Sequence, residues 1–523
     1  MPHRDAHRLN GTLLLRLTVF CSGAAVLILE LLGSRLLAPV FGSSLYVWSS
    51  LIAVTLLALA VGYRAGGMAA DRFEPLPMLY RALVVAGWLV LLIPFLRRAM
   101  LPAAAALGLR GGALVSALLM LGPALALLGA ISPLAAKAAV SGLESLGLRV
   151  GGLYALSTVG SLAGALATGF VLIPEFGVRR LLGVTAAVLF LPALAHWTSA
   201  PRGPDRRLWR ALAVLGLLAA LVSSLLHATY PMKAADSPWQ LLFRSDSPYG
   251  EVKVAQHRQS RVLLLNGTMQ TALDLTTGYP VFPYAIGVAS LLRTAHPRAK
   301  RALLIGFGGG VLADYLTGRG LTVESVEIDP IIAAAARRFF VRRPGLAVAE
   351  ADGRTFLARA APGAYDAVLL DAYAGDAPPA HLLTAEAFQL VRRALAPGGL
   401  GLANVIARTG ADGALARSVG LTLRAVFPWA EAYAVEGGPG PTNVLFVFSE
   451  RPRTLKRLVP VPGQQQVLQA ARGLLDRRLA LDAGPAVLLT DDHNPCESLS
   501  VRELESMRAH IHALIPGWLL LYL

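Results

Sequence analysis

The sequence is poor in cysteine. It has two cysteines among 523 residues, Cys21 in an apolar run and Cys496 in a polar tail. This pair alone cannot build a disulfide framework and provides no metal-ligand spacing. We therefore expect neither a disulfide-stabilised fold nor a metal site.

Charged residues are scarce, and acidic residues more so than basic ones. Charged side chains make up 15% of the chain and hydrophobic ones 55%, which indicates a membrane protein. The 32 acidic residues against 48 Lys and Arg give a formal net charge of +16. Much of the Arg lies in short loops between apolar runs, without interleaved aromatics, so membrane topology and anionic lipid explain the charge better than nucleic acid.

Long apolar runs alternate with short Arg-containing loops over the first 232 residues. About 20 apolar residues span the hydrocarbon core as a helix. The sequence predicts a multi-pass α-helical membrane domain over 1–232 with about seven spans, at 12–32, 47–66, 80–97, 112–133, 152–173, 181–198 and 209–228. The stretch 97–112 leaves room for a further short or re-entrant segment.

The basic loops predict the sidedness of these spans. They lie on the same side as the N-terminus, and the positive-inside rule makes that side cytoplasmic. Seven spans would then place the C-terminal half outside, whereas the ligand inferred below is cytoplasmic. We expect a cell (inner) membrane protein with a cytoplasmic catalytic domain, which requires an even number of spans or a departure from the charge rule.

After residue 232 the apolar runs shorten to strand length. Residues 246–272 alternate and include an Asn-Gly pair, which predicts a β-hairpin within a small β domain and linker over 233–290. Alternating strands and helices then predict an α/β Rossmann-like domain with a parallel, doubly wound sheet over 291–523. The expected strands are 301–306, 322–328, 346–350, 366–371, 399–406, 429–435 and 443–449, and the expected helices 310–319, 330–340, 353–360, 384–396 and 411–426. The apolar tail, IHALIPGWLLLYL, is too short to span and is expected on the membrane or on the bundle.

A glycine cluster follows the first strand of this domain. The stretch LLIGFGGG carries Gly306, Gly308 and Gly310 between a strand and a helix. Glycine permits close approach of a ligand to the backbone, and the helix start offers free N–H groups. No basic residue lies at this helix start to bind a phosphate, so a pyrophosphate cofactor is disfavoured.

Acidic residues follow the next three strands. Glu327 is placed to accept both ribose hydroxyls, and Asp329 is expected as a helix N-cap. Asp352 is either an acceptor for an adenine amino group or an N-cap. Asp371 ends the fourth strand, and the carboxyl ends of such strands present ligands in one crevice. The pattern predicts a site for a neutral or cationic adenosine compound, such as S-adenosylmethionine or its decarboxylated form.

With these motifs the chain resembles the spermidine synthase (polyamine aminopropyltransferase) family, over about residues 245–450. Segments such as SGAAVLILELLGSRLLAPVFGSS resemble the helical part of its membrane-fused members. The resemblance implies a class I methyltransferase-type fold with a small N-terminal β unit, a sulfonium donor and a polyamine acceptor. Soluble relatives commonly pair as dimers or tetramers, which leaves a homodimer open.

The resemblance also implies roles for individual residues. On the donor side, Gln270 of LNGTMQ, Glu327 and the pair Asp352–Gly353 match family positions. Asp371 matches the catalytic aspartate, which accepts a proton from the attacking amine. The family's glycine-loop aspartate, which holds the donor's amine, is replaced by Gly308.

The acceptor side departs from the family pattern. Tyr279 matches an acceptor-site tyrosine, although Pro280 follows it where the family has His or Gln. Ala374 replaces the second acid of the acceptor site, and Asp376 is the nearest substitute. A cationic diamine needs carboxylates to offset its desolvation. Asp274, or Asp491 and Asp492 of TDDHNP, are further candidates unless they serve in turns or caps.

Three functions remain open from the sequence. The first is aminopropyl transfer, in which methylthioadenosine is released and Asp371 acts as the base. The second is an S-adenosylmethionine lyase or methyltransferase on the same fold, since the neutral Gly308 does not repel a carboxylate. The third is a transporter with a nucleoside-sensing domain.

Overall fold

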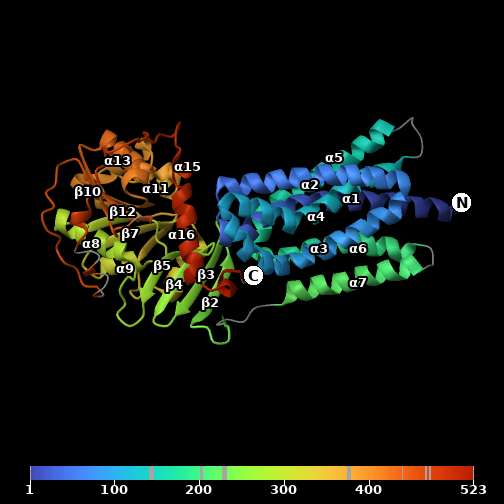
Figure 1. Cartoon of the computed structure of the whole chain (residues 1–523), viewed down its shortest axis with the longest axis horizontal. Coiled ribbons are helices and arrows are strands. Elements are labelled where there is room, and N and C mark those ends of the chain that lie inside the picture. The colour runs from blue at the N-terminus through green and yellow to red at the C-terminus, as the bar shows by residue number, and fades with distance from the viewer. Residues whose placement is uncertain are drawn as a thin grey trace. The chain divides into compact units, whose positions relative to one another are not determined.

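The chain forms two compact units in the computed structural model (Figure 1). The structure describes residues 2–140, 146–200, 204–226, 232–373, 378–438, 440–463, 465, 468–469 and 473–521. One unit contains Met1–Thr229 with Gly517–Leu523, and the other contains Tyr230–Pro516. The division expected at residue 290 is not a boundary between these two units, and residues 517–523 of the C-terminal tail belong to the first unit.

The N-terminal unit is built from helices, with a few non-helical residues between them. Its helices are α1 (Pro2–Phe41), α2 (Leu45–Arg72), α3 (Pro75–Ala104), α4 (Gly108–Ala139), α5 (Leu146–Ala167), α6 (Ile173–Ser199) and α7 (Pro204–Leu225), joined by short turns at Ala105–Leu107 and Thr168–Leu172. The expected spans fall on these helices, and the fifth continues through the π-helical turn Thr168–Leu172. The end of the last expected span lies outside the described residues. Among the described residues, five continuous helical segments are long and apolar enough to cross a membrane, and two of them contain a pair of these helices.

Glycines allow close packing between helices of this unit. A Cβ at Gly160 would lie 2.2 Å from the Phe20 carbonyl oxygen, so α5 and α1 touch through backbone. A Cβ at Gly62 would lie 2.1 Å from the Ala126 carbonyl oxygen, which gives the same contact between α2 and α4. Such small-residue crossings bring helices together where hydrophobic burial alone does not, as in lipid.

The C-terminal tail packs within the helical unit. Helix α17 (Gly517–Leu521) buries Leu519, Leu520 and Leu521. Arg97 of α3 is fully buried, and its Nη1 donates to the Leu521 carbonyl oxygen at 2.8 Å while its Nε donates to the Leu36 carbonyl oxygen at 3.0 Å. The tail therefore joins the bundle, as one of the two expectations for it stated.

The second unit begins with a five-stranded antiparallel sheet. Its strands are β1 (Met232–Lys233), β2 (Trp239–Asp246), β3 (Glu251–His257), β4 (Ser260–Leu265) and β5 (Thr268–Asp274), paired in chain order. Asn266 and Gly267 both have positive φ, 49° and 79°, so the expected Asn-Gly turn joins β4 to β5. The expected hairpin is thus part of a larger sheet, which packs on Ile332, Ala335 and Phe340.

The larger sheet has seven strands in the order β11-β12-β10-β9-β6-β7-β8. These are β6 (Arg301–Ile305), β7 (Thr322–Glu327), β8 (Ala347–Glu350), β9 (Tyr365–Leu370), β10 (Leu395–Ala407), β11 (Trp429–Ala434) and β12 (Thr442–Ser449). Five neighbouring strands are parallel, but β12 runs antiparallel to both β10 and β11. The expected all-parallel sheet is therefore wrong at this edge, because β11 and β12 are joined by a short connection that permits only an antiparallel return.

Helices cover both faces of this sheet, as a Rossmann-like domain requires. They are α8 (Pro283–Ala295), α9 (Val311–Thr317), α10 (Pro330–Phe339), α11 (Gly353–Arg359), α12 (Ala385–Ala394) and α13 (Ala414–Val426), followed by α15 (Cys496–Leu499) and α16 (Val501–Leu514). Strand residues alternate between the faces: Val368 and Leu370 pack with α12 and α13, and Leu369 packs with α8 and α9.

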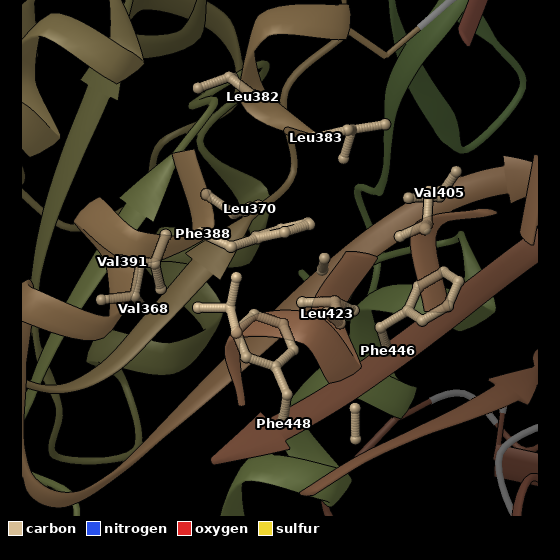
Figure 2. Close-up of a cluster of buried hydrophobic side chains, with 14 of the residues drawn as sticks. Val368, Leu370, Leu382, Leu383, Phe388, Val391, Val405, Leu423, Phe446 and Phe448 are labelled. Atoms are coloured by element: carbon tan, nitrogen blue, oxygen red, sulfur yellow. The ribbon is translucent and has the colours of Figure 1, made fainter. Parts of the chain in front are cut away.

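The core on the α12 and α13 side is apolar and closely packed. Figure 2 shows Phe388 and Val391 of α12 beside Val368 and Leu370, with Phe446 and Phe448 of β12 nearby. All these side chains are at most 5% exposed. This packing fixes the carboxyl ends of β9 and β10, from which the residues of the site emerge.

Candidate active site

The glycine loop brings two strand ends into contact. Gly306 follows β6 with φ 94°, and a Cβ there would lie 2.2 Å from the Asp371 carbonyl oxygen. Only glycine combines this backbone conformation with such a close approach. Gly308 has φ 50°, and Gly310 has φ 70° at the N-cap of α9. The loop therefore lies directly against the backbone that carries Asp371.

Three successive amides of the loop are bonded to side chains. Glu327 Oε2 accepts from the backbone N–H groups of Phe307 at 3.2 Å and Gly308 at 3.0 Å. The Gly309 N–H donates to Thr271 Oγ1 at 2.9 Å. These amides are thus committed to a carboxylate and a hydroxyl, which makes the loop an unsuitable cradle for phosphate.

Glu327 is 7% exposed at the end of β7. Burial raises the pKa of Glu327, and hydrogen bonds from the backbone of Asp329, Gly308 and Phe307 act in the opposite direction. The buried carboxylate can still accept further hydrogen bonds, because each carboxylate oxygen has two lone-pair sites. The ribose-binding role of Glu327 stays a prediction.

Asp329 caps helix α10. Its carboxylate accepts from the N–H groups of Ile331 and Ile332, which confirms the expected N-cap. Ser247 also donates to Asp329 Oδ2, at 2.5 Å. The loop before β3 is therefore attached to the end of β7.

Asp352 has two contacts that bear on its two possible roles. Its Oδ1 accepts from the Thr355 N–H at 2.8 Å, as an N-cap does, and its Oδ2 lies 3.1 Å from His381 Nε2. Burial alone would raise the pKa of Asp352, but the hydrogen bonds from Thr355 and His381 lower it. Gly353 packs on β6, since a Cβ there would lie 2.4 Å from Ile305 Cγ2. The capping role is present, and adenine binding through Oδ2 stays a prediction.

Asp371 follows β9 and accepts two side-chain hydrogen bonds. Asn404 Nδ2 donates to its Oδ1 at 2.8 Å, and the Tyr284 hydroxyl donates to its Oδ2 at 3.0 Å. Burial raises the pKa of Asp371 to about 6, against the lowering effect of these two donors. A carboxyl group with this pKa is a base at neutral pH that can still accept a proton readily.

The sequence did not single out Tyr284, Thr271 or Asn404. Thr271 adjoins Gln270, and Asn404 is a polar residue in the apolar run GLGLANVIA, at the carboxyl end of β10, so its position was a usable signal. Tyr284 gave no signal, because it reaches Asp371 from helix α8, far away in the sequence.

The remaining donor-side candidate, Gln270, lies on β5. The pairing of β5 with β4 shifts from Thr271–Leu263 to Met269–Leu264, which makes Gln270 the extra residue of a β-bulge. Bulges redirect side chains and occur beside active sites. Gln270 thus lies next to Thr271, the residue that contacts the glycine loop.

Of the acceptor-side candidates, Tyr279 lies among described residues and contacts another tyrosine. The ring of Tyr279 packs edge-on against Tyr315 with 6.1 Å between centroids, and Arg319 lies 6.0 Å from it. Tyr284, and not Tyr279, is the tyrosine bonded to Asp371. Asp376 lies outside the described residues.

Two of the other acids considered for the acceptor side have local partners. Asp491 forms a two-pronged ion pair with Arg354, and Asp274 Oδ1 accepts from the N–H groups of Thr276 and Thr277 in a turn. Within the described residues no group of three or more His, Cys, Asp or Glu side chains could hold a metal ion.

These features converge because the strands are parallel neighbours. In the sheet β6 lies between β9 and β7, so the glycine loop has Asp371 on one side and Glu327 on the other, with Asp352 beyond β8. The result is a carboxylate-rich strand edge with a base of raised pKa, which suits a cationic, nucleoside-like ligand.

The sequence is similar to those of several known proteins. The chain is similar to polyamine aminopropyltransferases. It is 29% identical to that of Vibrio vulnificus over 273 residues, covering 49% of this chain and 84% of the relative. It is 28% identical to that of Mycobacterium tuberculosis over 403 residues, covering 66% of this chain and 73% of the relative. The second share exceeds the whole C-terminal unit, so that similarity extends into the helical unit.

A second group of similar proteins is named for a different activity. The chain is 30% identical to putrescine N-methyltransferase 1 of Nicotiana tabacum over 170 residues, which cover 31% of this chain and 44% of the relative. No protein-family model matches the sequence. The similarities to named transferases confirm the prediction of an aminopropyltransferase-like transferase.

Proposed function

We propose that this chain is a membrane-bound, spermidine synthase-like enzyme that transfers an aminopropyl group from decarboxylated S-adenosylmethionine to an amine. The observation that carries the proposal is Asp371, a partly buried carboxylate with a pKa of about 6 beside the glycine loop. The named activity of the similar proteins supports the same reaction class.

The chemistry follows from the charges of donor and site. The amine nitrogen attacks the aminopropyl carbon next to the sulfonium, forming a C–N bond as the C–S bond breaks. The bonding electrons return to sulfur, and methylthioadenosine leaves as a neutral thioether. Asp371 accepts the proton that the amine loses. The other residues hold the reactants in line, which is the larger part of such catalysis.

Glu327 and Asp352 are proposed to bind the nucleoside part of the donor. Glu327 is already held by the loop amides, so its carboxylate is fixed before the ribose arrives. Asp352 Oδ2 would exchange its contact with His381 for the adenine amino group. Gln270, Gly308 and Gly310 complete the donor site in this proposal, and Tyr279 and Asp376 stay the candidates for binding a polyamine acceptor.

S-adenosylmethionine itself is the donor in a second candidate function. Two observations favour it: Gly308 is neutral, and putrescine N-methyltransferases are among the similar proteins. Methyl transfer to the same amine would leave S-adenosylhomocysteine, whereas a lyase reaction on the donor's own group would release methylthioadenosine without any amine. The products therefore distinguish the reactions.

The helical unit is proposed to span the cell (inner) membrane as a multi-pass anchor, with the catalytic unit in the cytoplasm. Its helices expose large apolar side chains along their length, such as Phe170 at 81% and Leu162 at 59%. Exposed apolar surface on this scale suits lipid as its surroundings. Reporter fusions at the two termini would test the sidedness.

The first experiment uses the purified full chain in detergent. The protein is incubated with S-adenosylmethionine or its decarboxylated form, with and without putrescine, and the products are identified by mass spectrometry. Methylthioadenosine with spermidine, lost in Asp371→Asn, is the expected result. S-adenosylhomocysteine with a methylated amine would establish the second candidate instead. Measurable donor binding without any turnover would overturn both and favour a nucleoside-sensing role.

A further inference from the structure

A second asparagine lies behind the base. Asn443 of β12 is paired in the sheet with Ile406 of β10, two residues beyond Asn404. Its Nδ2 donates to Asn404 Oδ1 at 2.9 Å, while Asn404 Nδ2 donates to Asp371 Oδ1 at 2.8 Å. The two amides and the carboxylate thus form one chain of hydrogen bonds, in which all donors point toward Asp371.

This chain has a direction. The Asn404 side chain has one oxygen and one NH₂ group, and its oxygen is occupied by the donor from Asn443. Its NH₂ group therefore faces Asp371. The backbone of Asn404 is held as well, because its carbonyl oxygen accepts from the Tyr373 hydroxyl at 3.2 Å and that hydroxyl accepts from the Ile406 N–H at 2.7 Å.

We propose that Asn443 is a positioning residue that keeps Asn404 turned as a hydrogen-bond donor toward Asp371 in both protonation states of that carboxyl. The inference rests on the proposed function for its catalytic meaning. When Asp371 is ionised, the Asn404 donor stabilises it. When Asp371 is protonated, Asn404 would gain by rotating to offer its oxygen, but the rotation would turn its NH₂ group toward the NH₂ group of Asn443, so both amides would have to turn together. The protonated form is left without this acceptor.

The consequence is a base that stays ionised at neutral pH despite its burial. Asn404 is 5% exposed, so an unpaired donor or acceptor there is costly. Among the described residues, the other titratable groups that interact with this carboxyl, or with Tyr373 beside it, are uncharged and hold their protons, because burial raises the pKa of each. They are Tyr284 of α8, Tyr373 after β9, and Cys496 of α15, beyond which lie Glu497 and Glu503.

Two substitutions test the direction of the chain. Asn443→Leu removes the donor and frees Asn404 to rotate, so protonated Asp371 gains an acceptor and its titration midpoint rises by about one pH unit. Asn443→Asp offers only acceptors, draws the Asn404 NH₂ group away from Asp371 and produces a larger rise. Thr442→Val is the matched control on the same strand, because the Thr442 hydroxyl accepts from the Glu436 N–H instead.

The titration is followed without turnover. Infrared pH-difference spectra are recorded on the full chain in detergent, and the Asp371 band is the one missing in Asp371→Asn. The pH dependence of methylthioadenosine release is measured beside it. Upward shifts of the midpoint in both Asn443 variants, absent from Thr442→Val, support the inference. An unmoved midpoint in Asn443→Leu overturns it, even if activity falls.

The two readouts separate this inference from the proposed function. If wild-type protein releases no methylthioadenosine from either donor, the proposed transfer fails while the infrared midpoints still decide the role of Asn443. If the transfer is observed but the midpoints do not move, the reaction stands and Asn443 has no positioning role.

Discussion

Replacing Tyr284 by Phe removes one of the two side-chain donors to Asp371 and leaves the ring in place. The hydroxyl donates to Asp371 Oδ2 at 3.0 Å, and hydrogen bonds to charged groups contribute about 1.5–3 kcal/mol. Because Asp371 is only partly buried, we take the lower end, which corresponds to about one pH unit. The pKa of Asp371, about 6 in the native protein, is expected to rise toward neutrality.

An upward shift of the Asp371 pKa makes the loss of activity depend on pH. The base is active when ionised, so activity rises with pH through its pKa. Moving the pKa up by about one unit lowers the ionised fraction at pH 7 from about nine-tenths to about half. The expected loss in kcat/KM at pH 7 is therefore only about twofold, and it disappears above pH 8, whereas below pH 6 it approaches about tenfold.

The assay is the pH profile of methylthioadenosine release between pH 5 and pH 9. Tyr279→Phe is the matched comparison, because its ring packs on Tyr315 and no hydroxyl contact with Asp371 is observed. Its rising limb is expected at the wild-type pH. A limb that stays in place in Tyr284→Phe, or moves in Tyr279→Phe instead, would refute the assignment of Tyr284 as the partner of the base.

Three further predictions concern the same crevice. Glu327→Gln replaces one carboxylate oxygen by an NH₂ group, although Oε2 accepts from the loop amides of Phe307 and Gly308 and Oε1 accepts from the Asp329 N–H. Donor affinity measured by calorimetry should therefore fall by about tenfold or more, and unchanged affinity would contradict the proposed ribose site. Gly306→Ala places a methyl group 2.2 Å from a carbonyl oxygen and should destabilise the protein by more than about 2 kcal/mol. Gly320→Ala is the control, because Gly320 has a similar positive φ of 88° but open space around it, and it should cost clearly less. Equal losses of unfolding temperature in the two variants would show that backbone strain alone, and not the close contact, causes the effect. Asp371→Asn should raise the unfolding temperature at pH 8 but not at pH 4. The raised pKa of Asp371 in the folded state makes its ionisation oppose folding as the pH rises from about 4 to 6, by at most about 3 kcal/mol. An equal effect of the substitution at both pH values would contradict the raised pKa.

The sequence predicted the strand-end residues because they obey local rules. A glycine cluster after an apolar strand, and acids after the next three strands, occupy defined positions in any parallel sheet. The strand and helix positions of the α/β part followed from the same periodicity, and the structure places each within a few residues of the expectation. Asp329 was recognisable as a cap because it directly precedes Pro330, which suits the first turn of a helix.

The partners of those residues depend on contacts between distant segments. Tyr284 and Asn404 lie 87 and 33 residues from Asp371, and no local pattern links them to it. The antiparallel place of β12 between β10 and β11 also escaped prediction, because its apolar pattern resembles that of its parallel neighbours and only the short connection to β11 marks the reversal. The same strand carries Asn443, so a sheet taken as wholly parallel would not have placed that residue behind the base.

The chain leaves the helical unit to form the C-terminal unit and then returns to it, so the catalytic unit is attached at both of its ends. The C-terminal unit, Tyr230–Pro516, is an insertion in the helical unit, which resumes at Gly517. It is thus tethered at both ends, on one side by α7 and on the other by α17, whose Leu521 carbonyl oxygen is held by Arg97. A single proteolytic cut in either connection would leave the catalytic unit attached. Two attachment points also restrict the volume that the catalytic unit can explore, which raises its effective concentration close to the helical unit.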